Sequence, residues 1–265
     1  MDLVNEALRA PATPRATARA GLCALVVGGG GALGSAVLEQ LLGRGRFAPV
    51  RVLVTQGFKG SVRGLEPVLA PAFDDATEPA RALAQVAVVV FDRERHANGR
   101  EDAFLRAEPQ ALPVLARWLR QQGVRHVVIV MPHSPAGLPQ ALKLGLANLD
   151  EQAVTSLGFE QVVFVRTPQQ PGALAGGPWL QRLADGLLMQ LRLMIPAAHQ
   201  PVRVHKVAQF VAELAAQLPA GSPGTRVVPP ELMWLAAQQD DAGPLVAAWL
   251  AGAELPLLRA PRVRL

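Results

Sequence analysis

The sequence contains no tyrosine and only one cysteine, Cys23, in 265 residues. No phenol group can therefore act as an acid or a base anywhere in the chain. A single thiol can form neither an intrachain disulfide nor a cysteine-based metal site, and within its apolar run Cys23 is expected to be a small buried side chain. Aromatic residues make up only 5% of the sequence, so core packing must come mainly from Leu, Val and Ala.

Long apolar runs are also missing. None approaches the roughly 18–20 residues that a membrane-spanning helix needs, and the first residues lack the basic and apolar segments of a secretory signal. We therefore expect a cytoplasmic protein with no membrane partner. The five histidines are scattered without metal-ligand spacing, so no metal site is expected.

Basic residues are in excess but are not concentrated in one stripe. The net charge is +5 and the sequence pI is about 10.5, yet the arginines are spread along the chain, with small clusters only near the two termini. Binding of nucleic acid requires a basic patch with aromatic side chains for stacking, or a recognised motif. Neither is present, so nucleic acid is not an expected partner.

The most informative feature is a run of four glycines between an apolar strand and an amphipathic helix, Ala32–Leu42. Two spacings fit it, Gly28-x-x-Gly31-x-x-Gly34 and Gly29-x-Gly31-x-x-Gly34. Glycines allow close approach of the backbone to phosphate, and the N–H groups at the following helix start attract anions. The pattern predicts a dinucleotide site that includes Gly28, Gly30, Gly31, Ala32, Leu33 and Gly34. The alternative is a glycine-rich turn in an α/β protein that binds no nucleotide.

Strand and helix patterns alternate along the chain, which predicts an α/β fold with a doubly wound parallel sheet. Short Val-rich runs, typical of strands buried on both faces, lie at Cys23–Val27, Val50–Thr55, Val86–Phe91, His126–Met131 and Gln161–Arg166, with a further strand at Thr225–Val228. Helices are expected at Ala32–Leu42, Pro79–Ala84, Pro109–Gln122, Pro139–Leu157, Trp179–Met194, Lys206–Gln217 and Gly243–Leu250. The third strand should lie between Lys59 and Asp75, where Pro67–Pro71 is a poor candidate because prolines bracket it.

The domain organisation follows from these patterns. Residues 1–20 are expected to be a flexible N-terminal extension, and residues 21–265 a single domain. Residues 168–265 are expected to form a cap on the substrate side of the sheet. The apolar stretch Trp179–Met194 suits a pocket for a small apolar substrate, but such spacing more often belongs to core or to a homodimer face.

Four segments together resemble the atypical short-chain dehydrogenase/reductase superfamily, in particular NmrA-like and related NAD(P)H-binding proteins. They are the glycine turn, Gly123-Val124-Arg125-His126, Phe164-Val165-Arg166-Thr167-Pro168 and Val204-His205-Lys206-Val207-Ala208. The resemblance spans residues from about 23 to 210, and only the glycine turn is specific by itself. It implies a Rossmann-like sheet with a small C-terminal substrate cap.

Enzymes of this superfamily use a Tyr-x-x-x-Lys pair on the helix after the fifth strand and a Ser at the end of that strand. Counted back from Arg166, the tyrosine position falls near Lys143 and the lysine position near Ala147, while the serine falls near Met131-Pro132. All three roles are vacant in this register. Ser134, His133 and Lys143 are the remaining candidates for moving a proton, against the alternative that they are ordinary loop and helix side chains.

The choice of dinucleotide depends on the end of the second strand. NAD-preferring sites usually carry an acid there, about 20 residues beyond the glycines, but this chain has Val54-Thr55-Gln56-Gly57. Lys59 and Arg63 follow and would suit the 2′-phosphate of NADP, whereas Gln56 would equally suit the ribose hydroxyl of NAD. The sequence thus predicts NADP or NAD, with a lean to NADP.

Two further residues are expected near the cofactor. Asp92 follows the fourth strand, where it either hydrogen-bonds the cofactor or pairs with the arginines of the loop Asp92-Arg93-Glu94-Arg95. Met131 ends the fifth strand at the same edge of the sheet.

Three functions remain open. The preferred one is a dinucleotide-binding redox sensor, regulator or assembly factor, because the phosphate turn is intact while the Tyr-Lys register is empty. The second is an NADP(H)-dependent oxidoreductase with a non-standard proton donor, Ser134 or His133. The third is an interaction scaffold that no longer binds nucleotide.

Overall fold

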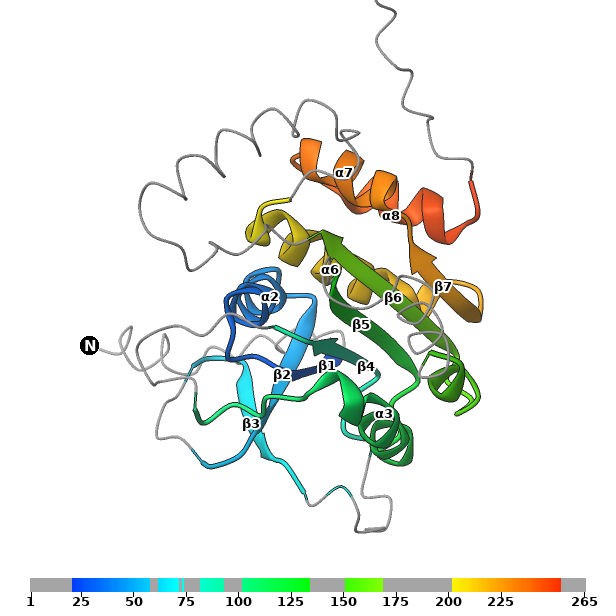
Figure 1. Cartoon of the computed structure of the whole chain (residues 1–265). Helices are drawn as coiled ribbons and strands as arrows, with labels where there is room; N and C mark the ends of the chain where they lie inside the picture. The colour runs from blue at the N-terminus through cyan, green and yellow to red at the C-terminus, as the bar shows by residue number, and fades with distance from the viewer. Residues whose placement is uncertain are drawn as a thin grey trace, which may run out of the picture.

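Seven parallel strands form a single sheet in the order β3-β2-β1-β4-β5-β6-β7 (Figure 1). The computed structural model describes residues 21–57, 62–71, 73, 82–92, 102–133, 151–168 and 202–253. The strands are β1 (Leu22–Val27), β2 (Phe47–Val54), β3 (Leu65–Leu69), β4 (Val86–Val90), β5 (His126–His133), β6 (Gln161–Pro168) and β7 (Gly224–Val228). The expected Rossmann-like doubly wound parallel sheet is confirmed.

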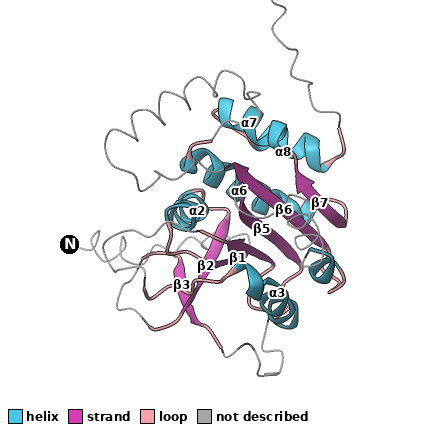
Figure 2. Cartoon of the chain, viewed as in Figure 1, coloured by secondary structure: helices cyan, strands magenta, loops and turns pink. Residues whose placement is uncertain are grey.

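Helices cover both faces of this sheet (Figure 2). They are α2 (Ala32–Gly43), α3 (Leu112–Gln121), α6 (Val204–Gln217), α7 (Pro230–Gln238) and α8 (Gly243–Leu250), with 3-10 turns η1 (Pro109–Ala111) and η3 (Leu218–Ala220). Because successive side chains of a strand point to opposite faces, Val26 and Val88 pack with α2 and α6, whereas Val27 and Val89 pack with α3. Strands buried in this way read as continuous apolar runs, which is why the sequence shows them clearly.

The strand that was hardest to place lies at the edge of the sheet. Among the described strands β3 pairs only with β2, and Pro67 stands opposite Val52 in the register. The N–H of Ala70 donates to the carbonyl of Val54 at 2.8 Å, so the strand's alternation turns the nitrogen of Pro67 away from β2, where no ladder hydrogen bond is lost. The expectation that prolines disfavour a strand here was wrong, because an edge strand tolerates a proline in this orientation.

Two helix predictions need correction. Of the expected helix Pro79–Ala84, residues 82–84 are described and are not helical. Instead Leu83 is tied into the base of the sheet, with its N–H donating to Gln122 O at 2.9 Å and its carbonyl accepting the Cys23 thiol at 3.3 Å. Helix α7 was not predicted. Within the expected helix 139–157, residues 151–155 are helical, whereas residues 139–150 lie outside the described residues.

The thiol of Cys23 lies at this same end of the sheet. Its side chain is half-buried rather than fully enclosed, and burial raises the pKa of the thiol above its usual value, partly offset by the nearby Arg51 guanidinium. Cys23 is therefore expected to stay a protonated, weakly reactive thiol at neutral pH.

Helices α6, α7 and α8 all come from the C-terminal part of the chain, and α7 and α8 both pack against α6 (Figure 1). Residues 202–253 thus supply a helix against the sheet, a seventh strand and two covering helices. The expected cap, residues 168–265, stays a prediction, because residues 169–201 lie outside the described residues, as does the N-terminal extension 1–20.

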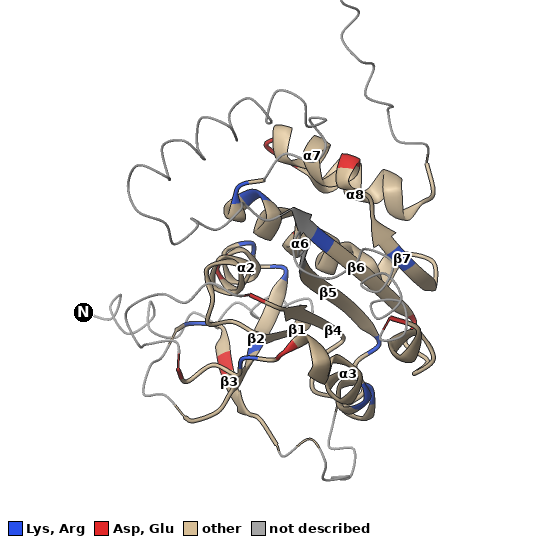
Figure 3. Cartoon of the chain, viewed as in Figure 1, with Lys and Arg blue, Asp and Glu red and all other residues tan. Residues whose placement is uncertain are grey.

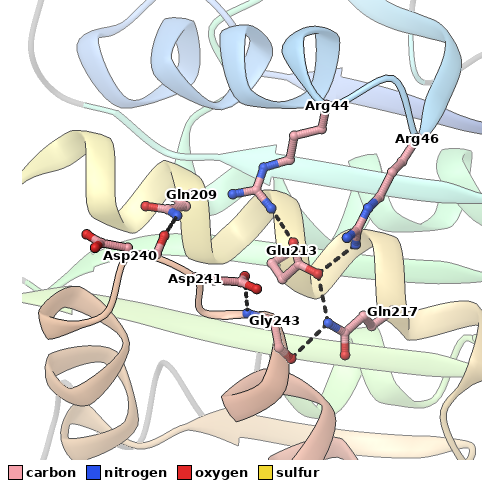
Figure 4. A network of polar contacts seen from close by, with 8 residues as sticks. All are labelled: Arg44, Arg46, Gln209, Glu213, Gln217, Asp240, Asp241 and Gly243. Atoms are coloured by element: carbon pink, nitrogen blue, oxygen red, sulfur yellow. Dashed lines mark hydrogen bonds and ion pairs between the residues drawn. The ribbon is translucent and has the colours of Figure 1, made fainter.

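A buried carboxylate joins α6 to the turn between α2 and β2 (Figure 4). The side chain of Glu213 is 2% exposed and forms ion pairs with Arg44 and with Arg46, the latter at 2.6 Å. Gln217, one helical turn further along α6, donates to Glu213 at 2.8 Å and to the carbonyl of Gly243 in α8 at 3.0 Å. This network connects α2, α6 and α8 through polar contacts at the rim of an apolar layer.

His126 provides a pH-dependent contribution to stability. It is 5% exposed, its Nδ1 has no hydrogen-bond partner among the described residues, and its Nε2 lies 3.6 Å from Glu160. Burial lowers the pKa of His126 below its ordinary value, although Glu160 opposes this shift. The unfolded chain therefore binds a proton at His126 more readily than the folded chain does, and stability falls as the pH drops below about 6.5.

We expect His126→Gln to flatten this acid dependence, because glutamine does not titrate. Urea unfolding midpoints measured from pH 8 to pH 5 would follow it in both proteins. If the wild type and the variant lose stability in parallel over that range, His126 does not carry the effect.

Lysine and arginine side chains of the described residues are spread over several elements, including α3, α6, β6 and β7 (Figure 3). Within the described ranges, no helix combines the length and the apolar character that crossing a bilayer requires. Over the same part of the chain, no three His, Cys, Asp or Glu side chains come together as a set of metal ligands.

Candidate functional site

The site lies where the order of the strands reverses. From β1 the chain moves outward to β2 and β3, and it then returns to the other side of β1 to form β4. The carboxyl ends of β1 and β4 therefore lie side by side, followed by Gly28 and by Phe91–Asp92. Ligands of open α/β sheets bind outside the carboxyl ends of the strands at such a switch point.

The glycine turn fits tightly between β1, β4 and α2. Gly28 has φ +85° and lies so close to β4 that a Cβ there would overlap the carbonyl oxygen of Val90. Gly34, in the first turns of α2, lies against the backbone of Gly28, and a Cβ at Gly34 would overlap that residue's carbonyl oxygen. Both positions require glycine, which lets α2 start directly above the end of β1.

The third glycine meets a carboxylate. Gly31 is the N-cap of α2, and a Cβ there would lie 2.5 Å from Oδ2 of Asp92. A Cβ at Gly29 would instead meet the end of the Leu38 side chain, at 2.7 Å. Backbone or a neighbouring carboxylate thus restricts Gly28, Gly31 and Gly34, which favours the spacing Gly28-x-x-Gly31-x-x-Gly34.

Asp92 binds the start of α2. Its Oδ2 accepts a hydrogen bond of 2.6 Å from the backbone N–H of Leu33, and no side-chain cap comes from Gly31 itself. A carboxylate at this position satisfies an N–H group that the helix cannot satisfy internally and interacts favourably with the helix dipole. The expected pairing of Asp92 with Arg93 or Arg95 involves residues outside the described part of the chain.

A short segment before α3 lies along the end of β2. Ala103 O accepts a 2.7 Å hydrogen bond from the N–H of Thr55, Leu105 N donates to Leu53 O at 3.0 Å, and Phe104 forms an antiparallel bridge with Val54. Since Val54 O faces β3, these bonds lie on the β1 side of β2, in the space beyond the end of β1. Phe104 packs into the apolar core there, and a Cβ at Gly29 would lie 3.4 Å from its ring.

The other predicted site residues are less closely grouped. Gln56 is exposed just beyond β2, and Met131 is partly exposed near the end of β5, where it stands opposite Arg166. Gly30 and Ala32 are partly exposed at the start of α2. His133 is the last residue of β5, at the carboxyl edge. Lys59, Ser134 and Lys143 lie outside the described residues.

Sequence reasoning missed three features of this edge. It did not find the Asp92–Leu33 contact or the packing of Phe104 against Gly29. Each of these contacts joins the glycine turn to a residue more than fifty positions away in the sequence. It also missed the ion pair of Arg166 with Glu151 at 2.6 Å, which fastens the end of β6 to the helical residues 151–155. The acid at 92, two residues beyond the Val-rich β4, was the one usable signal.

No family model matches the sequence, and no curated protein matches it. Among solved structures, the chain is similar to a nucleoside-diphosphate-sugar epimerase from Staphylococcus aureus, with 11% identity over 78% of this chain and 71% of that chain, and a TM-score of 0.46. UDP-glucose 4-epimerase from Brucella ovis in complex with NAD is 17% identical over 78% of this chain and 77% of its own, with a TM-score of 0.44.

A third similar structure is the triphenylmethane reductase of a Citrobacter species complexed with NADP(H). It is 16% identical over 77% of this chain and 68% of its own, and its TM-score is 0.45. All three are likenesses at low identity. The assignment of the fold therefore rests on the strand order and the parallel pairing of this chain.

Proposed function

We propose that this chain binds NAD(P)(H), with the diphosphate at the start of α2. The observation that carries this proposal is the glycine turn of Gly28, Gly31 and Gly34 at the switch point of a sheet whose first six strands follow the order 3-2-1-4-5-6. This combination of strand order and glycine turn is the one that binds dinucleotides in Rossmann-like folds.

The turn supports the proposal because it exposes backbone rather than side chains to a ligand. The N-cap residue Gly31 supplies no capping side chain, and the Asp92 carboxylate already bound to Leu33 N–H shows that this helix start attracts a negative charge, as its N–H donors and dipole dictate. The exposed Gln56 just beyond β2 supports the proposal, because the ribose of the adenosine half binds near the end of this strand in Rossmann-like folds. A lean to NADP stays a prediction, since Lys59 lies outside the described residues.

We assign the bound dinucleotide a sensing, regulatory or assembly role rather than short-chain dehydrogenase chemistry. The chain has no tyrosine, so the acid that this chemistry uses is missing from every position, including those that the structure does not describe. Positioning of the substrate alone accelerates hydride transfer. Turnover must therefore be measured as well as binding.

Binding is tested by thermal unfolding with NADPH, NADP+, NADH and NAD+. A ligand that binds only the folded state at a hundred times its Kd stabilises by about 2.7 kcal/mol, which raises the Tm by several degrees. We expect such a rise with at least one dinucleotide and none with nicotinamide alone. An unchanged Tm with all four would leave the third function, a scaffold without nucleotide, as the better account.

Turnover separates the sensor from an oxidoreductase. We expect NADPH absorbance to stay constant with carbonyl and flavin acceptors. If the absorbance falls at rates well above the buffer control, His133→Ala and Ser134→Ala would show which of the two residues moves the proton.

A further inference from the structure

We propose that the chain occupies its own cofactor crevice, with Asp92 in place of the diphosphate and Phe104 in place of part of the adenosine, so that a dinucleotide must displace both to bind. The inference rests on the proposed function, since it specifies how access to that same site is controlled. Two independent contacts carry it, one polar and one apolar.

The polar contact places a negative charge where the ligand's own charge belongs. Asp92 Oδ2 lies 2.6 Å from the N–H of Leu33, and Gly31 is so close to this carboxylate that any side chain there would collide with it. The backbone N–H groups in the first turn of a helix are the donors that a diphosphate uses in this fold. A carboxylate and a diphosphate cannot both occupy that donor, and their like charges repel each other.

The apolar contact fills the neighbouring half of the crevice. In a Rossmann-like fold the adenosine ribose lies at the end of β2, between that strand and the glycine turn. Here the backbone of residues 103–105 takes the hydrogen bonds of Leu53 and Thr55 on this side, and the ring of Phe104 lies next to Gly29. An aromatic ring against the glycine turn is a good substitute for the apolar face of an adenosine.

Both contacts belong to the same connection, the one that leads from β4 to α3. Asp92 stands at its start and Phe104 close to its end. Binding becomes an exchange of internal for external groups, and the affinity reports the difference between them.

The two halves also predict different ligand preferences. A free diphosphate competes only with Asp92, whereas AMP competes mainly with Phe104. Only a full dinucleotide replaces both internal groups at once, so a protein of this design discriminates against mononucleotides.

The test compares dinucleotide affinity in wild type and in Asp92→Asn by titration calorimetry with NADPH and NADH. Asparagine keeps a carbonyl oxygen that can accept from Leu33 N–H but removes the charge. We expect the affinity for the dinucleotide to rise about tenfold. In wild type the ligand must first break the charge-assisted hydrogen bond between Asp92 and Leu33 N–H, and in the variant this bond carries no charge and is weaker. Asp102→Asn is the matched control: it removes an equal charge from an exposed side chain of the same connection, and we expect its affinity to stay within about twofold of wild type.

Phe104→Leu tests the second contact, with AMP as the probe and a melting curve of the free protein to verify folding. We expect AMP binding to strengthen in this variant and to remain unchanged in Asp92→Asn. Unchanged or weaker dinucleotide binding in Asp92→Asn overturns the inference while wild-type binding sustains the proposed function. An equal gain in Asp102→Asn also overturns it, since the effect would then be one of general charge. Absence of binding in wild type and in every variant overturns both.

Discussion

Replacement of Gly28 by alanine is expected to destabilise the protein by about 3 kcal/mol and to abolish dinucleotide binding. Two costs add. The φ of +85° at Gly28 disfavours any residue with a Cβ by about 1–2 kcal/mol, and the methyl group would overlap the Val90 carbonyl, an overpacking cost of about 1–3 kcal/mol. The glycine turn must move away from β4, and the start of α2 moves with it. Urea unfolding and calorimetry with NADPH measure the two effects.

Gly45→Ala separates the two costs. Gly45 has φ +62°, in the turn between α2 and β2, but a Cβ there meets nothing within 4 Å. We expect this variant to lose only about 1 kcal/mol and to bind dinucleotide as wild type does. Equal losses in the two variants would mean that β4 adjusts to the added methyl group, and that close packing is not what requires glycine at 28.

The second large effect is expected for Glu213→Ala, with a loss of about 3 kcal/mol. Removal of one partner from a buried ion pair typically costs this amount, because the remaining charges lose their compensation. Arg44, whose side chain is 22% exposed, is left beside the apolar layer, and Gln217 loses an acceptor. The loosened contact between α2 and α6 should lower the Tm measured by circular dichroism.

The matched control for Glu213 is Glu66→Ala. Glu66 pairs with Arg51 at 3.0 Å, but its side chain is 54% exposed, so the pair contributes between zero and about 1 kcal/mol. A loss for Glu213→Ala no larger than that for Glu66→Ala would contradict a stabilising role of the buried network.

The sequence was sufficient for the elements whose residues carry a local signal. The central residues of β1, β4, β5 and β6 form short apolar, Val-rich runs that are buried on both faces, and such runs differ from helices by their length and by their flanking glycines and prolines. The glycine turn was likewise found from spacing alone. The alternation of strand and helix patterns was also enough to predict a doubly wound parallel sheet.

Features that depend on contacts between distant segments could not be predicted. β3 contains Pro67 and is acceptable only because it is an edge strand, a fact that strand order decides. Residues 82–84 have the composition of a helix end, yet the hydrogen bond between Leu83 and Gln122 fixes them in an extended connection. The Asp92 contact is of the same kind, since a carboxylate two residues beyond β4 has no local pattern that selects Leu33 as its donor.

Pro67 also bears on how copies of this chain can associate. A strand adding to the outer side of β3 would meet a ring nitrogen where a donor is needed, so the new ladder would lack a bond at its middle. β7, at the opposite margin of the described sheet, has the sequence Gly224-Thr225-Arg226-Val227-Val228 and offers an uninterrupted row of amide donors. Among the described strands, lateral growth of the sheet from one molecule into another is thus disfavoured at β3 by its proline, whereas β7 contains no such residue.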